Sequence, residues 1–343
     1  MSTLRLILPG SLDSLNDYGV DEGFLPPLPQ LRRFLARAQS CEDSADSFSQ
    51  ALLHALPLST ESRLNSSAAL SYLADSGVAP EGVCFRLDPV HLKVDRDHAR
   101  LLSGENVPLW KEEAEALIET FNRHFAEDGL HLRCFDAKRW YLCLPENPGI
   151  VCADLDQVVG RSVEPFNPTG PWARQWKSWL TEAQMLFFEH PVNERREARG
   201  QLPVNSLWLW GGDRLPEGSL VEPVQLFGEH ELLSGLAAHF ELPLAPFSAA
   251  SPLTPETTLN SVLLDNEAYS LLINGDLHGW REALPKLEAH LQRAETLLRE
   301  GIFSEVELLP LNGHLYRLNR WRLRQFWRRG SSLAAHFFPD QGQ

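Results

Sequence analysis

The stretch spanning residues 190–212, HPVNERREARGQLPVNSLWLWGG, gathers the side chains best suited to holding a small anion. Asn193 and Arg196 are three residues apart, so on a helix both can face one point in space. The arginine fork suits a carboxylate or a phosphate, and the asparagine supplies a neutral donor. His190 precedes this pair, and Asn205 precedes an apolar run typical of a buried strand. The alternative, which spacing alone favours, is a self-satisfied loop in which Arg196 pairs with a nearby acid.

A second candidate is the segment LNRWRLRQFWRRG near the carboxyl end, in which no acid interrupts a run of arginines. Guanidinium groups beside indole rings can stack on bases or bind an acidic surface. The segment therefore predicts a surface for an acidic partner or a single-stranded nucleic acid. The alternative is that acidic residues elsewhere in the fold neutralise it. The residues of this proposed partner surface are Arg320, Trp321, Arg324, Trp327 and Arg328.

A third cluster, DPVHLKVDRDH, holds carboxylates and imidazoles of the kind that suit a hard metal ion. On a strand, His91, Asp95 and Asp97 would share one face with Lys93. An ammonium group among alternating charges is more typical of an exposed edge strand. We therefore predict no metal site in this cluster.

The composition indicates a globular protein with substantial cores. The chain has 343 residues, of which 43% are hydrophobic, which favours about two domains. No apolar run approaches the roughly 18 residues that span a bilayer, and the opening LRLILPG is too short for a secretion signal. We therefore expect a cytoplasmic protein without membrane association. The five cysteines are odd in number and lack CxxC spacing, which disfavours a disulfide framework or a zinc site.

The net charge of the chain indicates which classes of partner are favoured. The formal net charge is −15, whereas proteins that bind the phosphate backbone usually carry the opposite sign. Nucleic acid is therefore disfavoured as a partner, although a local basic patch on an acidic protein remains compatible with it.

Two patterns describe the elements that must position these residues. From 83 to 146, four short strand candidates accompany the helical segment KEEAEALIETFNRHFAEDG, which predicts a small α+β domain. Outside this segment, strands and helices alternate, which is typical of an α/β sheet with covering helices. In WARQWKSWLTEAQMLFFEH, Trp172, Trp176 and Trp179 repeat at helical spacing and are expected in the core. The run VNSLWLWGG is expected to be a buried strand that leads into a flexible turn.

The frame H-P-x-N-x-x-R-x-x-x-G-x-x-P-x-N, followed by an apolar strand and glycine, resembles the archaeal-type cofactor-independent phosphoglycerate mutases of the alkaline phosphatase superfamily. Over nearly its full length, the chain looks most like the bacterial RpfE-type regulatory proteins. The resemblance implies an alkaline phosphatase-like α/β core sheet with covering helices, formed by 1–82 and 147–343, and an inserted α+β domain at 83–146. The strand at 4–8 should then share a sheet with the strand at 206–210. The matching residues are His190, Pro191, Asn193, Arg196, Gly200, Pro203, Asn205 and Gly211.

Several positions depart from that family where it binds two metal ions. The family's first strand ends in Asp-Gly, whereas LILPG places Pro9 at the aspartate position. Arg32 falls where the family has a further aspartate, and DNEAYS keeps Asp265 and Glu267 but has Tyr269 in place of histidine. A two-metal phosphotransferase needs most of these ligands together. The departures therefore predict a protein without catalytic residues, metal or cofactor.

The resemblance and its departures together predict a non-catalytic regulatory or binding protein. Its expected partners are a small anionic ligand or another protein. The alternatives are a metal-dependent phosphoglycerate mutase or phosphohydrolase with rearranged ligands and, more weakly, a nucleic-acid-associated factor using the C-terminal arginines. Trp210 would close the floor of a weak anion cleft between the domains, where the family has arginine. The residues expected to line this cleft are Arg86, Arg139, His190, Asn193, Arg196 and Asn205.

Overall fold

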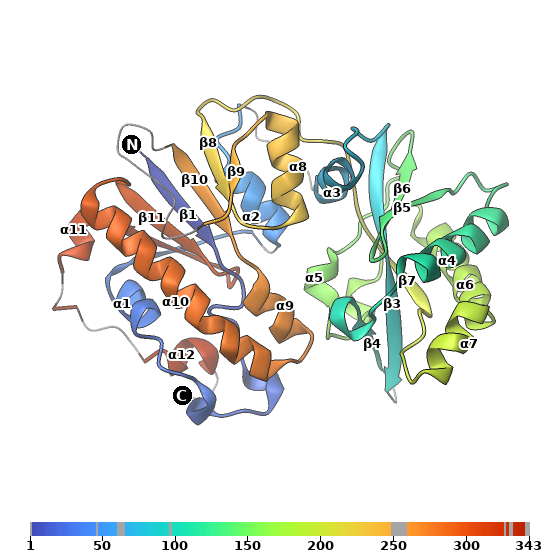
Figure 1. The fold of residues 1–343 in the computed structure, drawn as a ribbon, viewed down its shortest axis with the longest axis horizontal. Coiled ribbons are helices and arrows are strands. Elements are labelled where there is room, and N and C mark those ends of the chain that lie inside the picture. Colours follow the sequence, from blue (N-terminus) through green and yellow to red (C-terminus); the bar gives the residue numbers. More distant parts are fainter. Residues whose placement is uncertain are drawn as a thin grey trace. The chain divides into compact units, whose positions relative to one another are not determined.

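The computed structural model describes residues 2–45, 47–59, 66–95, 98–247, 259–325, 327–328 and 332–339. The chain divides into two compact units (Figure 1). The terminal unit contains residues 1–62 and 218–343, and the central unit contains residues 63–217. Each unit has its own sheet and its own hydrophobic core. The α/β class, with a multi-stranded sheet and covering helices, is confirmed.

The terminal unit is built on a seven-stranded sheet with the order β2-β12-β11-β1-β10-β8-β9. The strands from β11 to β9 are parallel to one another, whereas β12 is antiparallel to both of its neighbours. The carboxyl ends of the parallel strands therefore meet at one edge of the sheet. The strands are β1 (Thr3–Ile7), β2 (Gln39–Glu42), β8 (Val224–Phe227), β9 (Leu244–Ala245), β10 (Asn260–Leu264), β11 (Glu305–Leu309) and β12 (His314–Asn319).

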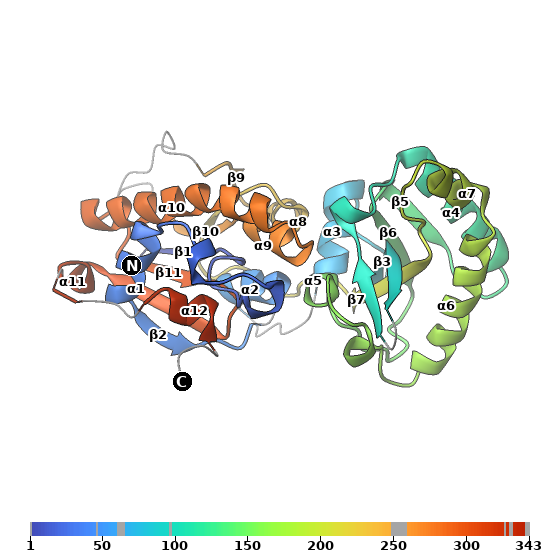
Figure 2. The same ribbon diagram turned by 90° about the horizontal axis from the view of Figure 1, so that it is seen from below.

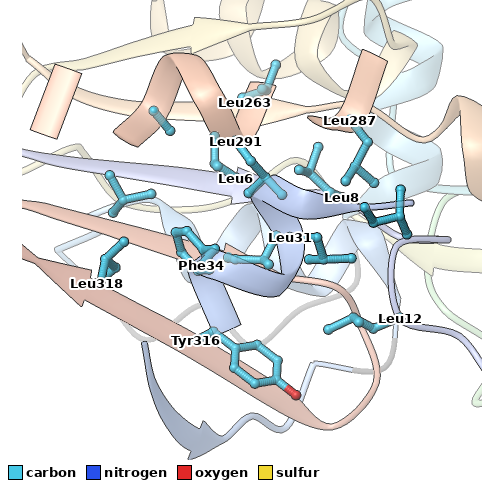
Figure 3. Close-up of a cluster of buried hydrophobic side chains, with 14 of the residues drawn as sticks. Leu6, Leu8, Leu12, Leu31, Phe34, Leu263, Leu287, Leu291, Tyr316 and Leu318 are labelled. Carbon is cyan, nitrogen blue, oxygen red and sulfur yellow. The ribbon is translucent and has the colours of Figure 1, made fainter. Parts of the chain in front are cut away.

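The main core of the terminal unit lies between this sheet and two helices, α1 (Pro29–Arg37) and α10 (Leu277–Glu300). Side chains on a strand alternate between faces, so Leu6 and Leu8 point to the same side. There they pack with Leu31 and Phe34 of α1 and with Leu291 of α10 (Figure 3). Figures 1 and 2 show α10 running along the sheet.

Shorter helices complete the terminal unit. The other face of β1 is covered by α2, where the Nη1 atom of Arg5 donates to the carbonyl oxygen of Ala55 at 3.1 Å. This bond fixes the end of α2 on the sheet because it satisfies one of the helix's last carbonyl groups. The helices are α2 (Phe48–Ala55), α8 (Glu231–Phe240), α9 (Glu267–Ile273), α11 (Arg320–Leu323) and α12 (Ala334–Phe337), with 3₁₀ turns at Asn16–Tyr18 and Glu22–Phe24.

The central unit is built around one long strand, β3. Its residues 83–86 pair with β6, residues 84–90 pair with β7, and residues 91–95 pair with β4. The sheet order is β4-β3-β6-β5, and β7 pairs with β3 outside this order, across from β6. The strands are β3 (Val83–Asp95), β4 (His98–Leu102), β5 (Leu132–Asp136), β6 (Arg139–Leu144) and β7 (Ser206–Asp213).

The two faces of β3 differ in chemistry. Phe85 and Leu87 point into an apolar core that also contains Trp176 and Trp179, as the helical spacing predicted. Arg86 and Asp88 point to the opposite face, which α3 covers (Figure 2). The helices are α3 (Ser67–Ser76), α4 (Lys111–His124), α5 (Leu155–Val158), α6 (Ala173–Phe188) and α7 (Pro191–Ala198), with 3₁₀ turns at Gly104–Asn106 and Glu164–Phe166.

Three sequence-based expectations differ from the structure. The strand at 4–8 does not share a sheet with the strand at 206–210, because β7 pairs with β3 and β1 lies between β10 and β11. The compact central unit is also longer than the expected insertion at 83–146, since it includes 63–82 and 147–217. The expected flexible turn at Gly211 and Gly212 lies inside β7. A β-carbon at Gly211 would collide with Ala68, so this glycine allows α3 to approach the strand closely.

Candidate functional site

His190 caps the first turn of α7. Its Nδ1 atom accepts a hydrogen bond from the backbone N–H of Val192 at 3.2 Å. Its Nε2 atom lies 3.1 Å from the hydroxyl oxygen of Thr120. Because Nδ1 accepts, the neutral ring carries its hydrogen on Nε2. Desolvation, followed by the positive charge of Arg195, lowers the pKa of His190 and favours this neutral form. His190 therefore serves the helix start as a cap.

The two predicted asparagines bind backbone groups. Asn193 is buried, and its amide donates to the carbonyl oxygens of Phe187 and Val204 at 2.7 and 2.8 Å while accepting from the Val204 N–H at 2.9 Å. Asn205 makes a similar two-way contact with Leu92, at 2.7 and 3.0 Å. These bonds satisfy the backbone around the loop that leads into β7. Both side chains therefore position the polypeptide.

Arg196 has no exposed surface. Its Nε atom donates to the carbonyl oxygen of Leu202 at 2.9 Å. Its Nη1 atom donates to the carbonyl oxygen of Pro108 at 2.8 Å and to Oε2 of Glu113 at 2.7 Å. The ion pair joins α7 to the first turn of α4. This geometry corresponds to the alternative in which the loop satisfies its own arginine, although the acid comes from another helix.

Arg86 is held in a buried aromatic environment on the α3 side of β3. Its Nε and Nη2 atoms donate to Asp88 at 2.9 and 2.8 Å. Its guanidinium carbon lies 4.8 Å from the ring centroid of Trp210 and 5.9 Å from that of Tyr141. The indole N–H of Trp210 also donates to Asp88 at 2.7 Å. Trp210 therefore contacts both members of the ion pair instead of closing an open floor.

Arg139 joins β6 to α3. Its Nε and Nη2 atoms donate to the carboxylate of Asp75 at 2.7 and 2.9 Å. The hydroxyl of Tyr141 donates to the same carboxylate at 2.5 Å, and burial raises the pKa of this phenol. The tyrosine therefore stays neutral and acts as a donor.

The six residues predicted to bind an anion are thus all engaged with protein groups. Four of them lie on α7 or beside it, and Arg86 and Arg139 lie on the face of the sheet that α3 covers. A phosphate at these arginines would compete with the carboxylates and backbone oxygens that they already bind, at a high desolvation cost. Anion binding by this set stays a prediction.

The predicted partner surface is exposed. Trp321 and Trp327 keep 69% and 66% of their surface accessible to solvent. Arg320, Arg324 and Arg328 are also exposed, and Arg320 donates to the carbonyl oxygen of Arg299 at 3.2 Å. Of the third cluster, Asp88 pairs with Arg86, the side chain of His91 contacts the carbonyl oxygen of Pro203, and Asp97 lies outside the described residues.

A different polar pocket lies at the carboxyl ends of β8 and β10 in the terminal unit. Its volume is about 420 Å³. Ligands of open α/β sheets bind at such strand ends, which makes this pocket the best candidate site. The side chains that give it chemical character are Glu229, Asp265, Asn266, Glu267, Lys286 and His290.

Lys286 lies between two of the acids of this pocket. Its ammonium nitrogen lies 3.0 Å from Oδ2 of Asp265 and 2.7 Å from Oε2 of Glu267. The Nε2 atom of His290 lies 2.9 Å from the same oxygen of Asp265. Lys286 and His290 are four residues apart on α10, so both reach one point. The resemblance singled out Asp265 and Glu267 but missed these two partners, because no local pattern in the sequence places α10 beside Asp265.

The ion pairs change the acidity of the pocket. Burial alone would raise the pKa of Asp265, but hydrogen bonds from His290 and Lys286 outweigh it and lower the pKa to about 2. The bonds to Glu267 and Asp265 likewise outweigh desolvation and raise the pKa of Lys286. Both groups are therefore charged at neutral pH. Among the described residues, no group of three His, Cys, Asp or Glu side chains is placed to hold a metal ion.

We expect the Asp265 ion pair to make stability depend on acidity. A folded-state pKa lowered from 3.8 to about 2 corresponds to about 2 kcal/mol of stability, fully present above pH 4. As pH falls towards 2, this contribution is lost. Urea unfolding should therefore show Asp265→Asn less stable than wild type by about 2 kcal/mol at pH 7, and by about half of that at pH 3. A stability difference that does not change with pH would contradict this.

Comparisons with known proteins give a distant but consistent relationship. No model of a known protein family matches the chain. A 2,3-bisphosphoglycerate-independent phosphoglycerate mutase of Methanosarcina barkeri is 27% identical over 142 residues, covering 41% of this chain and 35% of that protein. One from Methanothrix thermoacetophila is 35% identical over 66 residues, covering 19% and 17%. The matched segments therefore span about a third or less of these relatives. The chain is a distant homologue of cofactor-independent phosphoglycerate mutases.

Two solved structures align over nearly the whole chain. A cofactor-independent phosphoglycerate mutase from Thermoplasma acidophilum has a TM-score of 0.45 and 13% identity, covering 98% of this chain and 94% of its own. A protein from Pyrococcus horikoshii has a TM-score of 0.48 and 14% identity, covering 97% and 92%. None of the described helices is both long and apolar enough to cross a membrane.

Proposed function

We propose that this chain is a regulatory or binding relative of phosphoglycerate mutase that does not perform two-metal phosphoryl transfer. The observation that supports the proposal is the position of Lys286 between Asp265 and Glu267. These carboxylates correspond, in the resemblance, to the family's metal-ligand stretch. A divalent cation at this point would have to displace an ammonium that already bonds both acids.

Two features beside the pocket support the same proposal. The chain leaves β1 through Leu8 and the buried Pro9, so this strand end supplies no carboxylate of the kind that the family uses. Tyr269 on α9 has a phenol where the family has an imidazole. A phenol is a poor ligand for the metals in question. A phosphotransferase that lost one ligand could adjust, but several simultaneous losses remove the charge clamp on the phosphoryl group.

The finer part of the proposal is a bacterial, RpfE-type regulatory role in the cytoplasm with a small anion or a protein as partner. It rests on the full-length resemblance of the sequence. The competing function is a manganese-dependent mutase or phosphohydrolase with rearranged ligands, for which the retained Asp265 and Glu267 are the supporting residues.

A turnover assay separates the two. Purified protein incubated with manganese and 3-phosphoglycerate should form no 2-phosphoglycerate above the rate of the protein-free blank. The matched control is Asp265→Asn, because a contaminating mutase would be unaffected by it. Manganese-dependent turnover that disappears in Asp265→Asn would refute the proposal, since the activity would then belong to this pocket.

A further inference from the structure

The terminal unit contains a second, larger cavity that the proposed function does not use. Its volume is about 740 Å³, and it lies between α1, the proline-rich segment before it and part of the carboxyl-terminal chain. This volume is within the range of roughly 300–1,000 Å³ that is common for small-molecule sites. Leu31 and Phe34 of α1 are buried against the sheet, so the rest of the helix surface is free to line the cavity.

Among the described residues, the cavity is lined by four arginines and by no acidic side chain. Three of them, Arg32, Arg33 and Arg37, come from α1, and Arg328 comes from the carboxyl-terminal chain. The pair Arg33 and Arg37 places like charges four residues apart on a helix, which costs stability. The chain as a whole has a net charge of −15, so a local cluster of cations is the opposite of its overall charge.

By the residues that the structure describes, these charges are only partly compensated. Arg33 and Arg37 lie 3.8 and 3.6 Å from one carboxylate oxygen of Glu295. The same oxygen already accepts a hydrogen bond from Arg299 at 2.6 Å. One buried acid therefore serves three guanidinium groups. Arg32 and Arg328 are exposed and form no ion pair with any residue that the structure describes.

Apart from Ser332, the remaining described lining is apolar. It includes the run Pro26–Pro29 together with Ala36 and Leu333. Such a surface offers few partners for the hydroxyl groups of a bare sugar phosphate, but it suits a flat, weakly polar ring. Arginine adds to this preference because its planar guanidinium stacks on aromatic faces while binding phosphate oxygens bidentately.

We propose that this cavity binds a nucleoside polyphosphate, with the phosphates on Arg32, Arg33, Arg37 and Arg328 and the base against the proline-rich wall. More than one phosphate is needed to match the number of cations. The site is separate from the Asp265 pocket, so it stands whether or not that pocket is catalytic. Binding at this site would make the state of the protein depend on the nucleotide.

The test is calorimetric titration of the full chain with ADP, GDP and inorganic pyrophosphate, in EDTA so that no metal complex takes part. We expect at least one nucleoside diphosphate to bind, and pyrophosphate to bind at least about tenfold more weakly because it lacks the base. Raising the salt concentration should weaken the binding, since partly exposed charges are screened.

Two variants locate the site. The double substitution Arg32→Gln and Arg328→Gln should weaken nucleotide binding by at least about tenfold, because charge-assisted bonds to phosphate are lost. Both side chains are exposed, so the melting temperature should stay close to wild type. Arg324→Gln is the matched control: it removes the same charge from the same carboxyl-terminal stretch, but it does not line the cavity. It should leave the affinity within about twofold of wild type.

Three results would overturn the proposal. The first is the absence of nucleotide binding at millimolar concentration. The second is equal binding of pyrophosphate, which would leave no role for the proline-rich wall. The third is an equal loss in Arg324→Gln and in the double variant, because the ligand would then be held by the general positive charge of the C-terminal arginines and not by this cavity.

Discussion

Replacing Arg196 with methionine should destabilise the central unit by about 3–5 kcal/mol. The substitution leaves Glu113, which is only 6% exposed, as a buried charge without its main partner, and it also releases the carbonyl oxygens of Leu202 and Pro108. Urea unfolding followed by tryptophan fluorescence measures the effect, since Trp140, Trp176 and others in the same core report on this unit.

Arg199→Met is the matched control for Arg196. Arg199 is on the same polypeptide turn and reaches the other oxygen of Glu113 at 3.6 Å, but its side chain is 47% exposed. Exposed pairs contribute little, so the loss should be about 1 kcal/mol or less. Similar losses in the two variants would show that burial of Arg196 is not what makes its pair important, and would reopen a ligand-binding role.

The second large effect is expected at Asp88. Asp88→Leu leaves the buried Arg86 without its carboxylate and the indole N–H of Trp210 without its acceptor. We expect a loss of about 3–5 kcal/mol for this single change. Thermal and urea unfolding of the purified variant provide the measurement.

The double variant Arg86→Met with Asp88→Leu is the control for that prediction. Replacing both charges with apolar side chains removes the uncompensated charge, so the double variant should be more stable than Asp88→Leu alone. A double variant less stable than the single one would mean that Arg86 has other important partners around Tyr141.

Local patterns in the sequence predicted the helices and much of the core. Ala114, Leu117, Ile118 and Phe121 are buried along α4, as their spacing indicated. The helical spacing of Trp176 and Trp179 likewise identified a helix that packs into the core. These predictions succeed because helical burial depends on neighbours within one or two turns of the same segment.

Strand pairing was harder to predict because partners are distant along the chain. The sequence indicated only short strands between 83 and 146, yet β3 is long and continues through Pro89, which lies opposite Leu207 of β7. A proline usually marks a strand end or an edge. Residues 206–213 pair with this continuous strand in the central unit. The expectation that they share a sheet with residues 4–8 was therefore wrong.

For the candidate sites, too, the sequence predicted local features but not contacts between distant segments. Residue type and spacing singled out Asn193 and Arg196 as candidate anion ligands, with a self-satisfied loop as the alternative, but they could not show that Glu113 on a different helix pairs with Arg196. Likewise, Asp265 could be named from the resemblance, whereas the closeness of Lys286 depends on how α10 lies on the sheet. Both partners are set by packing and not by local sequence.

The most direct test of the proposal is the metal content of the chain. Protein dialysed against excess manganese, and then freed of unbound metal, is analysed by elemental mass spectrometry. We expect substoichiometric manganese, because Lys286 already neutralises Asp265 and Glu267 from a distance of 3.0 and 2.7 Å. About two tightly held manganese ions per chain, as a two-metal phosphotransferase requires, would contradict the account.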